Sequence, residues 1–294
     1  MADVAPTDSD TAEPARPVAG PTSGSGRPVA AETRKSGVTR LAGRIGIGGW
    51  RLIVLVLFLV GWHLASIPAG RLLLPSPIDV VPAFLDLVRS GRLPLALGES
   101  LLVFGSGYLL AVLTAIPIGV LMGGIRPLGA TLEIYVNGLN SMPRVAFVPL
   151  LILWFGLGFQ AKIVIVWLTA VFPIIINTYA GVLNADRELI EAARSFGASQ
   201  RQIFVRIMLP CALPYIIAGL RIGSSLAIIG TVVAELYTAL SGLGYLLVDF
   251  GHRFETAKYF VPVVVLMGLG VLISESLKLL EHRLARWKST TIEL

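Results

Sequence analysis

The stretch that decides the fold is polar and runs from residue 191 to residue 210. It opens with Glu191-Ala192-Ala193-Arg194-Ser195-Phe196-Gly197 and closes with Ile207-Met208-Leu209-Pro210. It lies in a chain that is 55% hydrophobic and 14% charged, with a mean hydropathy of +0.79. A soluble domain carries about 25% charged residues. The composition therefore predicts an integral membrane protein, all-α in class, from which this polar stretch projects.

The polar stretch and the residues just before it predict two short helices joined by a tight turn. Asp186 or Asn184 is placed to cap the first helix. Gly197 stands where a helix that must stop needs a residue able to take positive φ. Ser199 is expected to cap the second helix, with Gln202 three residues later to complete a capping box. A helix-turn-helix of this kind is suited to being held by another protein.

Composition also limits the chemistry expected of the chain. The single cysteine, Cys211, excludes an intramolecular disulfide, and no Cys/His cluster suggests a metal site. No Gly-x-x-x-x-Gly-Lys-Ser/Thr motif occurs, so any ATP hydrolysis is expected on a separate chain, and no cofactor is expected in this one. The net charge is +6, but the basic residues flank apolar runs. That distribution indicates membrane topology and not a nucleic-acid-binding face.

The chain divides into four predicted parts. Residues 1–44 are rich in Pro, Gly, Ser, Thr and Ala and predict a disordered cytoplasmic tail. Residues 45–68 predict a first transmembrane span, interpreted as uncleaved and not as a signal peptide. Residues 69–97 predict an external loop with an interfacial helix. Residues 98–288 predict a core of five further spans, with a cytoplasmic loop at 184–212.

The helix in the external loop is predicted from its cap and its periodicity. Ser76 suits the cap, Pro77 the first helical position and Asp79 the first turn. One face repeats apolar residues at helical spacing and is expected to lie along the outer membrane interface: Ile78, Val81, Phe84, Leu85 and Val88.

Positively charged residues predict the orientation of the spans. The five core spans are expected near 99–122, 129–158, 161–183, 213–236 and 260–280. Pro143 and Pro149 are expected to interrupt the third span and Pro173 the fourth, while Pro210 marks the return to apolar sequence before the fifth. With both termini and the polar loop inside, 16 of the 24 Lys and Arg residues are cytoplasmic and 6 are external. This asymmetry supports a cytoplasmic polar loop.

Polar residues within two spans are candidates to line a path through the membrane. In the third span they fall at i, i+3, i+4 and i+7, and in the fifth at i, i+7 and i+11: Asn137, Asn140, Ser141 and Arg144, then Ser224, Thr231 and Glu235. Such residues usually face a cavity or a partner. Other interpretations stay open. Arg144 could mark the end of its span, Ser224 could pack helices together with Gly223, and Glu235 could cap a loop at the outer interface.

The spacing of the polar stretch resembles the cytoplasmic "EAA" signature of ABC-importer permeases. Further segments are similar to the nitrate/sulfonate/taurine branch of that family, in a resemblance that extends over residues 74–287: Leu74–Pro77, Pro149–Gly158, Phe172–Thr178, Val233–Glu235 and Ser241–Tyr245. One position departs. Many relatives carry an arginine soon after the Ser-Leu that opens the second span, where this chain has Val103. This difference weakens any inference of the substrate of this chain from the substrates of those relatives.

The resemblance implies a six-span permease of the type I importer kind, with 98–288 as its core. It implies that the loop docks on an ATP-hydrolysing subunit through seven residues: Glu191, Ala192, Ala193, Arg194, Phe196, Gly197 and Arg201. The implied partners are two copies of a cytoplasmic ABC ATPase, a second permease subunit in a homodimer, an external substrate-binding protein and membrane lipid, with no nucleic acid. The implied location is the bacterial inner membrane with both termini cytoplasmic. The implied cargo is a small anion such as a sulfonate, taurine or nitrate.

Two other functions are compatible with a chain of this composition. A secondary transporter commonly shows an internal repeat with paired broken helices, and no convincing repeat joins the two halves here. A membrane-bound enzyme would need catalytic groups, yet His63, His252 and His282 lie far apart in sequence and no nucleophile or paired-carboxylate arrangement stands out. The expected role is therefore a transport subunit and not an enzyme.

Overall fold

A computed structural model describes residues 47–70 and 72–284 of the chain. The predicted tail at 1–44 lies outside these residues. Contacts divide the chain into residues 1–54 and residues 55–294, and the second unit holds the features discussed below. The part that the structure describes is helical, with no strand.

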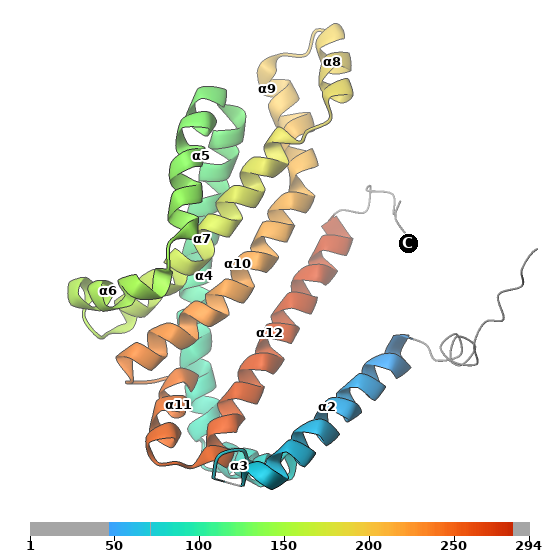
Figure 1. The fold of residues 1–294 in the computed structure, drawn as a ribbon. Coiled ribbons are helices and arrows are strands. Elements are labelled where there is room, and N and C mark those ends of the chain that lie inside the picture. The colour runs from blue at the N-terminus through green and yellow to red at the C-terminus, as the bar shows by residue number, and fades with distance from the viewer. Residues whose placement is uncertain (1–46, 71, 285–294) are drawn as a thin grey trace, which may run out of the picture. The chain divides into compact units, whose positions relative to one another are not determined.

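Eleven α-helices, one 3₁₀ turn and one π-helical segment follow one another within the described residues (Figure 1). They are α2 (Ile47–Ala69), α3 (Pro77–Arg89), α4 (Arg92–Gly124), α5 (Arg126–Ser141), η1 (Arg144–Phe147), α6 (Val148–Phe155), α7 (Phe159–Leu183), α8 (Arg187–Ser195), α9 (Gln200–Ile203), η2 (Phe204–Met208), α10 (Leu209–Thr238), α11 (Leu243–His252) and α12 (Thr256–Leu284). Five helices are long and apolar enough to cross a membrane, and α5 with α6 forms a sixth candidate, bent by 84°. The predicted all-α fold is confirmed within the described residues, with five or six candidate spans.

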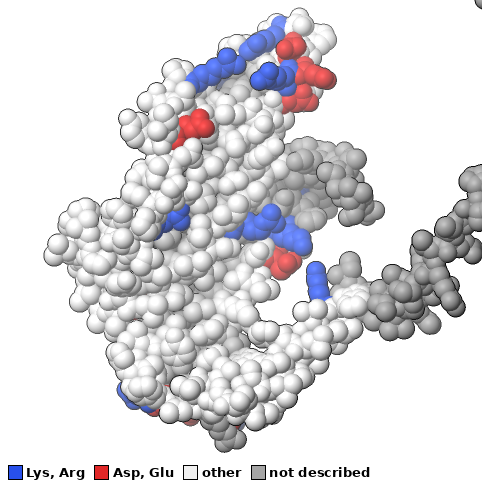
Figure 2. All heavy atoms as spheres, in the orientation of Figure 1, with Lys and Arg blue, Asp and Glu red and all other residues white. Residues whose placement is uncertain are grey.

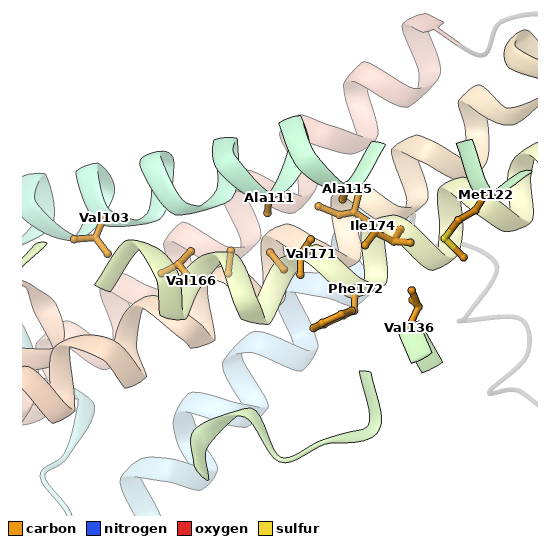
Figure 3. Packing of buried hydrophobic residues seen from close by; sticks show 12 residues of the cluster. Val103, Ala111, Ala115, Met122, Val136, Val166, Val171, Phe172 and Ile174 are labelled. Atoms are coloured by element: carbon orange, nitrogen blue, oxygen red, sulfur yellow. The ribbon is translucent and has the colours of Figure 1, made fainter. Parts of the chain in front are cut away.

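Helix α7 lies at the centre of the second unit, between α4 and α10 (Figure 1). Its buried face packs small and β-branched side chains against α4, as Val166 and Ile174 do against Ala111 and Ala115 (Figure 3). The two helices approach closely at Gly107, where an added Cβ would overlap Val166. A Cβ added at Gly105 of the same helix would meet no atom of this chain within 4 Å.

Pro173 does not break α7, contrary to the prediction. Proline has no N–H, so the carbonyl of Thr169 loses its helical partner. That carbonyl accepts a hydrogen bond from Nη1 of Arg144 at 3.2 Å. One turn further on, Nδ2 of Asn177 donates to the carbonyl of Pro173 at 2.8 Å. The Arg144 side chain thus satisfies the carbonyl that Pro173 leaves without a helical donor, which is one way that spanning helices tolerate proline.

The third span is interrupted once, at Met142 and Pro143, and not a second time at Pro149. Met142 is extended and ends α5, and the chain restarts in η1 and α6. Pro149 lies in the first turn of α6, where a helix needs no N–H donor. Arg144 therefore begins a new segment, and the prediction of one continuous helical face from Asn137 to Arg144 is wrong.

The second helix of the polar loop does not end before Pro210. Residues Gln200–Thr238 form one continuous helical stretch through α9, η2 and α10. The N–H of Leu209 donates to the carbonyl of Phe204, five residues back. This π turn lies directly before Pro210, whose ring would otherwise meet the carbonyl four residues earlier. The polar loop is thus joined to the following span without a break.

Helices α3 and α11 lie at the opposite end of the second unit from α8 and α9 (Figure 1). We call the end that holds α3 and α11 the far end, and the end that holds α8 and α9 the hairpin end. Ser76 caps α3 as predicted, and with Asp79 it forms a capping box. This helix packs against α12 and the start of α4 and buries Val80, Ala83 and Leu87 in a cluster that α11 completes, while the apolar face predicted from periodicity remains exposed. Helix α11 was not predicted, and the segment was expected to be a loop.

Candidate functional site

The two helices of the polar loop form a hairpin, α8–α9, with the predicted caps. Oδ1 of Asp186 accepts the N–H of Glu188 at 2.9 Å at the start of α8. Ser199 and Gln202 exchange both bonds of a capping box at the start of α9, at 3.3 and 2.8 Å. The hairpin conformation is therefore specified by its own short-range polar contacts.

Gly197 ends α8 in the left-handed conformation, with φ of +80°. The N–H of Ala198 donates to the carbonyl of Ala193 at 3.0 Å, and the N–H of Gly197 donates to the carbonyl of Arg194 at 2.9 Å. These two bonds make a Schellman motif, in which glycine is favoured because it has no Cβ. The prediction of a positive φ here is confirmed.

The residues predicted to dock on an ATPase lie together on the surface of this hairpin. Glu191, Arg194 and Arg201 are exposed, and Ala193 is half-buried. Phe196 is 91% exposed, the largest exposed fraction among the large apolar residues described. Charged side chains gather over the hairpin at the top of Figure 2, above a mostly uncharged surface. An exposed aromatic ring within a charged surface is typical of a protein-binding site.

The structure brings Arg144 together with Asn140 across the break between α5 and η1. Nη2 of Arg144 donates to the backbone carbonyl of Asn140 at 3.0 Å and to its Oδ1 at 2.6 Å, while Nη1 reaches Thr169 in α7. Asn137 and Ser141 are exposed on α5, and Oγ of Ser141 donates back to the carbonyl of Asn137. Arg144 is thus anchored across the contact between α5 and α7.

The polar residues of α10 are buried within the protomer. Oγ of Ser224 donates to the carbonyl of Arg221 at 2.8 Å, and Oγ1 of Thr231 donates to that of Ala227 at 2.9 Å. An added Cβ at Gly223 would meet Ile174 of α7. These contacts favour helix packing, the alternative left open for Ser224, over a position along an open path.

Glu235 is fully buried and holds the turn between α10 and α11. Its carboxylate accepts the hydroxyl of Ser100, 2.8 and 2.9 Å from the two oxygens, and the N–H of Gly244 at 2.8 Å. Oγ of Ser100 accepts the N–H of Leu243 at 2.8 Å. Gly242 within the turn has φ of +97°, and a side chain there would overlap the Glu235 carboxylate. This favours the loop-capping alternative for Glu235.

Sequence reasoning missed three residues that complete this polar cluster at the far end. Oε2 of Glu99 accepts the N–H of Gly242 at 2.9 Å. Nζ of Lys162 donates to the carbonyl and to Oγ of Ser241, at 3.1 and 2.9 Å, and its residue is only 3% exposed. Ser100 is the third. The sequence carries one signal for Glu99 and Lys162, because each is a charged residue at the start of an apolar run. Charged residues at such a position are expected to remain in water, so the signal did not indicate a buried cluster.

Comparison with known proteins decides the family. Residues 115–286 match the family model for the binding-protein-dependent transport system inner membrane component. The chain belongs to this family. A probable ABC transporter permease protein of Brucella abortus is 34% identical to this permease over 252 residues, covering 86% of this chain and 96% of that protein. The putative aliphatic sulfonates transport permease protein SsuC of Escherichia coli is 38% identical over 233 residues, covering 77% of this chain and 87% of that protein.

Solved structures agree on the fold. The MetNI methionine ABC transporter in an inward facing conformation superposes with a TM-score of 0.55 at 24% identity, covering 63% of this chain and 93% of that one. The matched family segment contains α7, the hairpin, α10 and α11. The permease is thus a multi-pass membrane transport subunit and not an enzyme, as predicted. Within the described residues, no group of three or more His, Cys, Asp or Glu side chains could hold a metal ion.

Proposed function

We propose that this permease is the membrane-spanning subunit of an ATP-driven importer for a small anion such as a sulfonate, taurine or nitrate. It works as a homodimer with two copies of a cytoplasmic ABC ATPase, which dock on the α8–α9 hairpins. An external binding protein delivers the solute. Closure of the ATPase pair moves the hairpins, and the spans then open toward the other side of the membrane.

The observation that carries the proposal is the connection between the hairpin and the core. The hairpin is continuous with α10, because residues Gln200–Thr238 are helical throughout. At 1.5 Å per residue this stretch is roughly 60 Å long. Helix α10 packs against α7 and carries Glu235 at the far end. A displacement of the exposed hairpin can therefore be transmitted to the far end of the molecule through one stiff helix.

The orientation proposed here puts the hairpin and both termini in the cytoplasm and the far end outside. The charge asymmetry of the sequence supports it. The exposed apolar face of α3 then lies in the outer membrane interface. Single-cysteine labelling in a Cys211→Ser background tests the orientation. A cysteine at position 199 is expected to react with an impermeant reagent only from the cytoplasmic side, and labelling from outside would exclude this topology.

The choice of an anion rests on Arg144 and on the named cargo of one relative. The guanidinium of Arg144 is held by Asn140 of α5, a helix that also exposes the polar side chains of Asn137 and Ser141, and a guanidinium can pair with an oxyanion. The sequence alone left Glu235 as an argument against an anion. Its carboxylate oxygens are engaged by Ser100 and Gly244, in a cluster apart from the contacts of Arg144 with α5 and α7.

Uptake by proteoliposomes that contain the permease, its ATPase and its binding protein tests the proposal. Accumulation of a sulfonate or nitrate is expected only when ATP is present in the compartment that the hairpin faces, and only when all three components are present. A permease that transports alone, driven by an ion gradient, would establish the secondary transporter instead. Conversion of the solute to another compound would establish the enzyme.

A further inference from the structure

A cavity toward the hairpin end of the permease plays no part in the proposed transport of an anion. It has a volume of about 270 Å³ and lies between the end of α4, the middle of α5 and the end of α7. Pockets for drug-sized ligands hold about 300 Å³ or more. This cavity therefore suits a ligand of only a few heavy atoms.

The wall of this cavity carries a single charged side chain. Of the described residues that line it, Glu133 of α5 is the charged one, and none is Lys or Arg. Oε2 of Glu133 accepts the hydroxyl of Tyr179 in α7 at 3.2 Å, and within the described part of the chain Oε1 receives no hydrogen bond. Arg144 does not line the cavity. The carboxylate is thus placed to attract a cation, away from the residue proposed to meet the imported anion.

Three further polar groups of the wall can each accept a hydrogen bond. The phenol oxygen of Tyr179 keeps its lone pairs after it donates to Glu133. Nδ2 of Asn184 donates to the carbonyl of Ala180 at 2.9 Å, and among the described residues nothing donates to its Oδ1. The amide of Asn137, one turn after Glu133, makes no hydrogen bond to the described chain. Oxygen acceptors around one carboxylate match the three N–H donors of a primary ammonium group.

The rest of the wall is apolar and suits a short hydrocarbon chain: Met122, Val136, Ile176, Ala180 and Leu183. We infer that this cavity binds a small primary alkylammonium ion, whose ammonium group pairs with Glu133 and whose chain covers the apolar wall. A carboxylate or sulfonate would be repelled by Glu133, since like charges brought together are costly. A hydrated metal ion would leave the apolar surface unused. The inference does not depend on which solute the permease imports.

The position of the cavity indicates from which side the ligand comes. Helix α7 ends at Leu183, with Asn184 as its cap, and the hairpin begins at Arg187. In the proposed orientation this end of α7 is cytoplasmic, so the amine would come from the cytoplasm and not from the external binding protein. Because the polar groups of the wall belong to both α5 and α7, a bound ammonium would also link these two helices.

Equilibrium binding to the full-length permease in nanodiscs tests the inference with three probes of one chain length. Near neutral pH n-butylamine is a cation, n-butanol is neutral and n-butyrate is an anion. Empty nanodiscs of the same lipid measure the partition of each probe into the bilayer. The permease is expected to bind n-butylamine about fivefold or more tightly than n-butanol, as for a partly exposed charge-assisted hydrogen bond, and n-butyrate least. Equal binding of n-butylamine and n-butanol, or no n-butylamine binding above that of empty nanodiscs, would overturn the inference.

Variants of Glu133 separate a binding role from a structural one. Glu133→Gln keeps an acceptor for Tyr179 and is expected to remove the preference for n-butylamine over n-butanol. Glu133→Asp keeps the charge and is expected to retain that preference. Glu255→Gln, whose carboxylate lies outside the cavity, is the matched control and should bind both probes as wild type does. An unchanged preference in Glu133→Gln, or an equal loss in Glu255→Gln, would overturn the assignment. ATP-dependent uptake of sulfonates by the assembled complex reports separately on the import function, so each can fail alone.

Discussion

The hydroxyl of Ser100 lies 2.8 and 2.9 Å from the two carboxylate oxygens of Glu235, although 135 residues separate them in sequence. The same oxygen accepts the N–H of Leu243, and Glu235 accepts that of Gly244. These bonds join α4 and α10 to the turn that leads into α11. Because α10 is continuous with the hairpin, the far-end turn and the ATPase-binding candidate are fixed to one helix.

Replacement of Ser100 by alanine should destabilise the permease. The change leaves the Leu243 N–H without its acceptor and removes one donor from the buried carboxylate of Glu235. Stranding buried polar groups of this kind costs about 1–3 kcal/mol in the free energy of unfolding. Thermal unfolding in detergent measures the loss. Ser276→Ala, which removes only an exposed hydroxyl bonded to its own helix, is the control and should unfold as wild type does. Identical midpoints for the two variants would contradict the role given to Ser100.

Acid should weaken the far end through Asp249 in α11. The hydrogen bond from Arg92, at 2.6 Å, lowers the pKa of the Asp249 carboxyl, and the charge of Arg253 at 2.8 Å adds to the effect. A carboxyl whose pKa is lowered by folding contributes stability above its unfolded pKa of about 3.9 and loses it as pH falls through the folded value. The stability difference between wild type and Asp249→Asn should be constant above about pH 5 and shrink below about pH 4.

Thermal unfolding across this pH range measures that difference. Asp86→Asn is the matched control, because Asp86 is exposed and lies 3.6 Å from Lys258. It should change the unfolding midpoint little at any pH. A difference between wild type and Asp249→Asn that grows on acidification would contradict the pairing with Arg92.

The sequence predicted the features that depend on nearby residues. The caps at Asp186, Ser76 and Ser199 and the turn at Gly197 each involve partners within five residues, so their patterns are visible in a single sequence. The apolar runs likewise predicted the spans, because a membrane requires about 20 apolar residues for each.

Features that depend on distant residues could not be predicted in the same way. The cluster around Glu235 joins residues 79 to 143 positions apart, and only the folded chain brings them together. Local chemistry led us to expect that Pro173 interrupts its span and that Pro210 marks the return to apolar sequence. A hydrogen bond from Arg144 to the Thr169 carbonyl compensates for the missing N–H of Pro173. The π-helical bond from the N–H of Leu209 to the carbonyl of Phe204 accommodates Pro210. Arg144 and Asn140 were predicted to lie near each other, and their side chains are hydrogen-bonded although a break in the helix separates them.

Replacement of Gly197 by valine should uncouple the permease from its ATPase. The left-handed conformation costs a non-glycine residue about 1–2 kcal/mol, so the turn between α8 and α9 should distort. Membrane insertion should remain normal, while ATPase binding and uptake are lost. Gly268→Val is the control, since Gly268 lies within α12 and an added Cβ meets open space. Normal uptake by the Gly197 variant would exclude a role for the hairpin turn.

Arg144→Ala should impair uptake of the solute while basal ATP hydrolysis by the complex continues. The change removes the guanidinium that contacts Asn140 and the Thr169 carbonyl. Arg144→Lys should keep part of the transport, because the charge survives and the planar fork does not. Initial uptake rates in proteoliposomes, with ATPase activity from the same preparation, measure both. If Arg144→Ala transports at the wild-type rate, Arg144 has only a structural role.

Docking of an ATPase on the α8–α9 hairpin is tested most directly by photo-crosslinking from position 196 in the assembled complex. Phe196 is replaced by a photoreactive analogue of phenylalanine in a Cys211→Ser background. The same replacement at Phe254, which is 71% exposed at the far end, is the control. A crosslink to the ATPase chain is expected from position 196 and not from position 254. Absence of that product from position 196, or equal yield from both positions, would contradict docking on the hairpin.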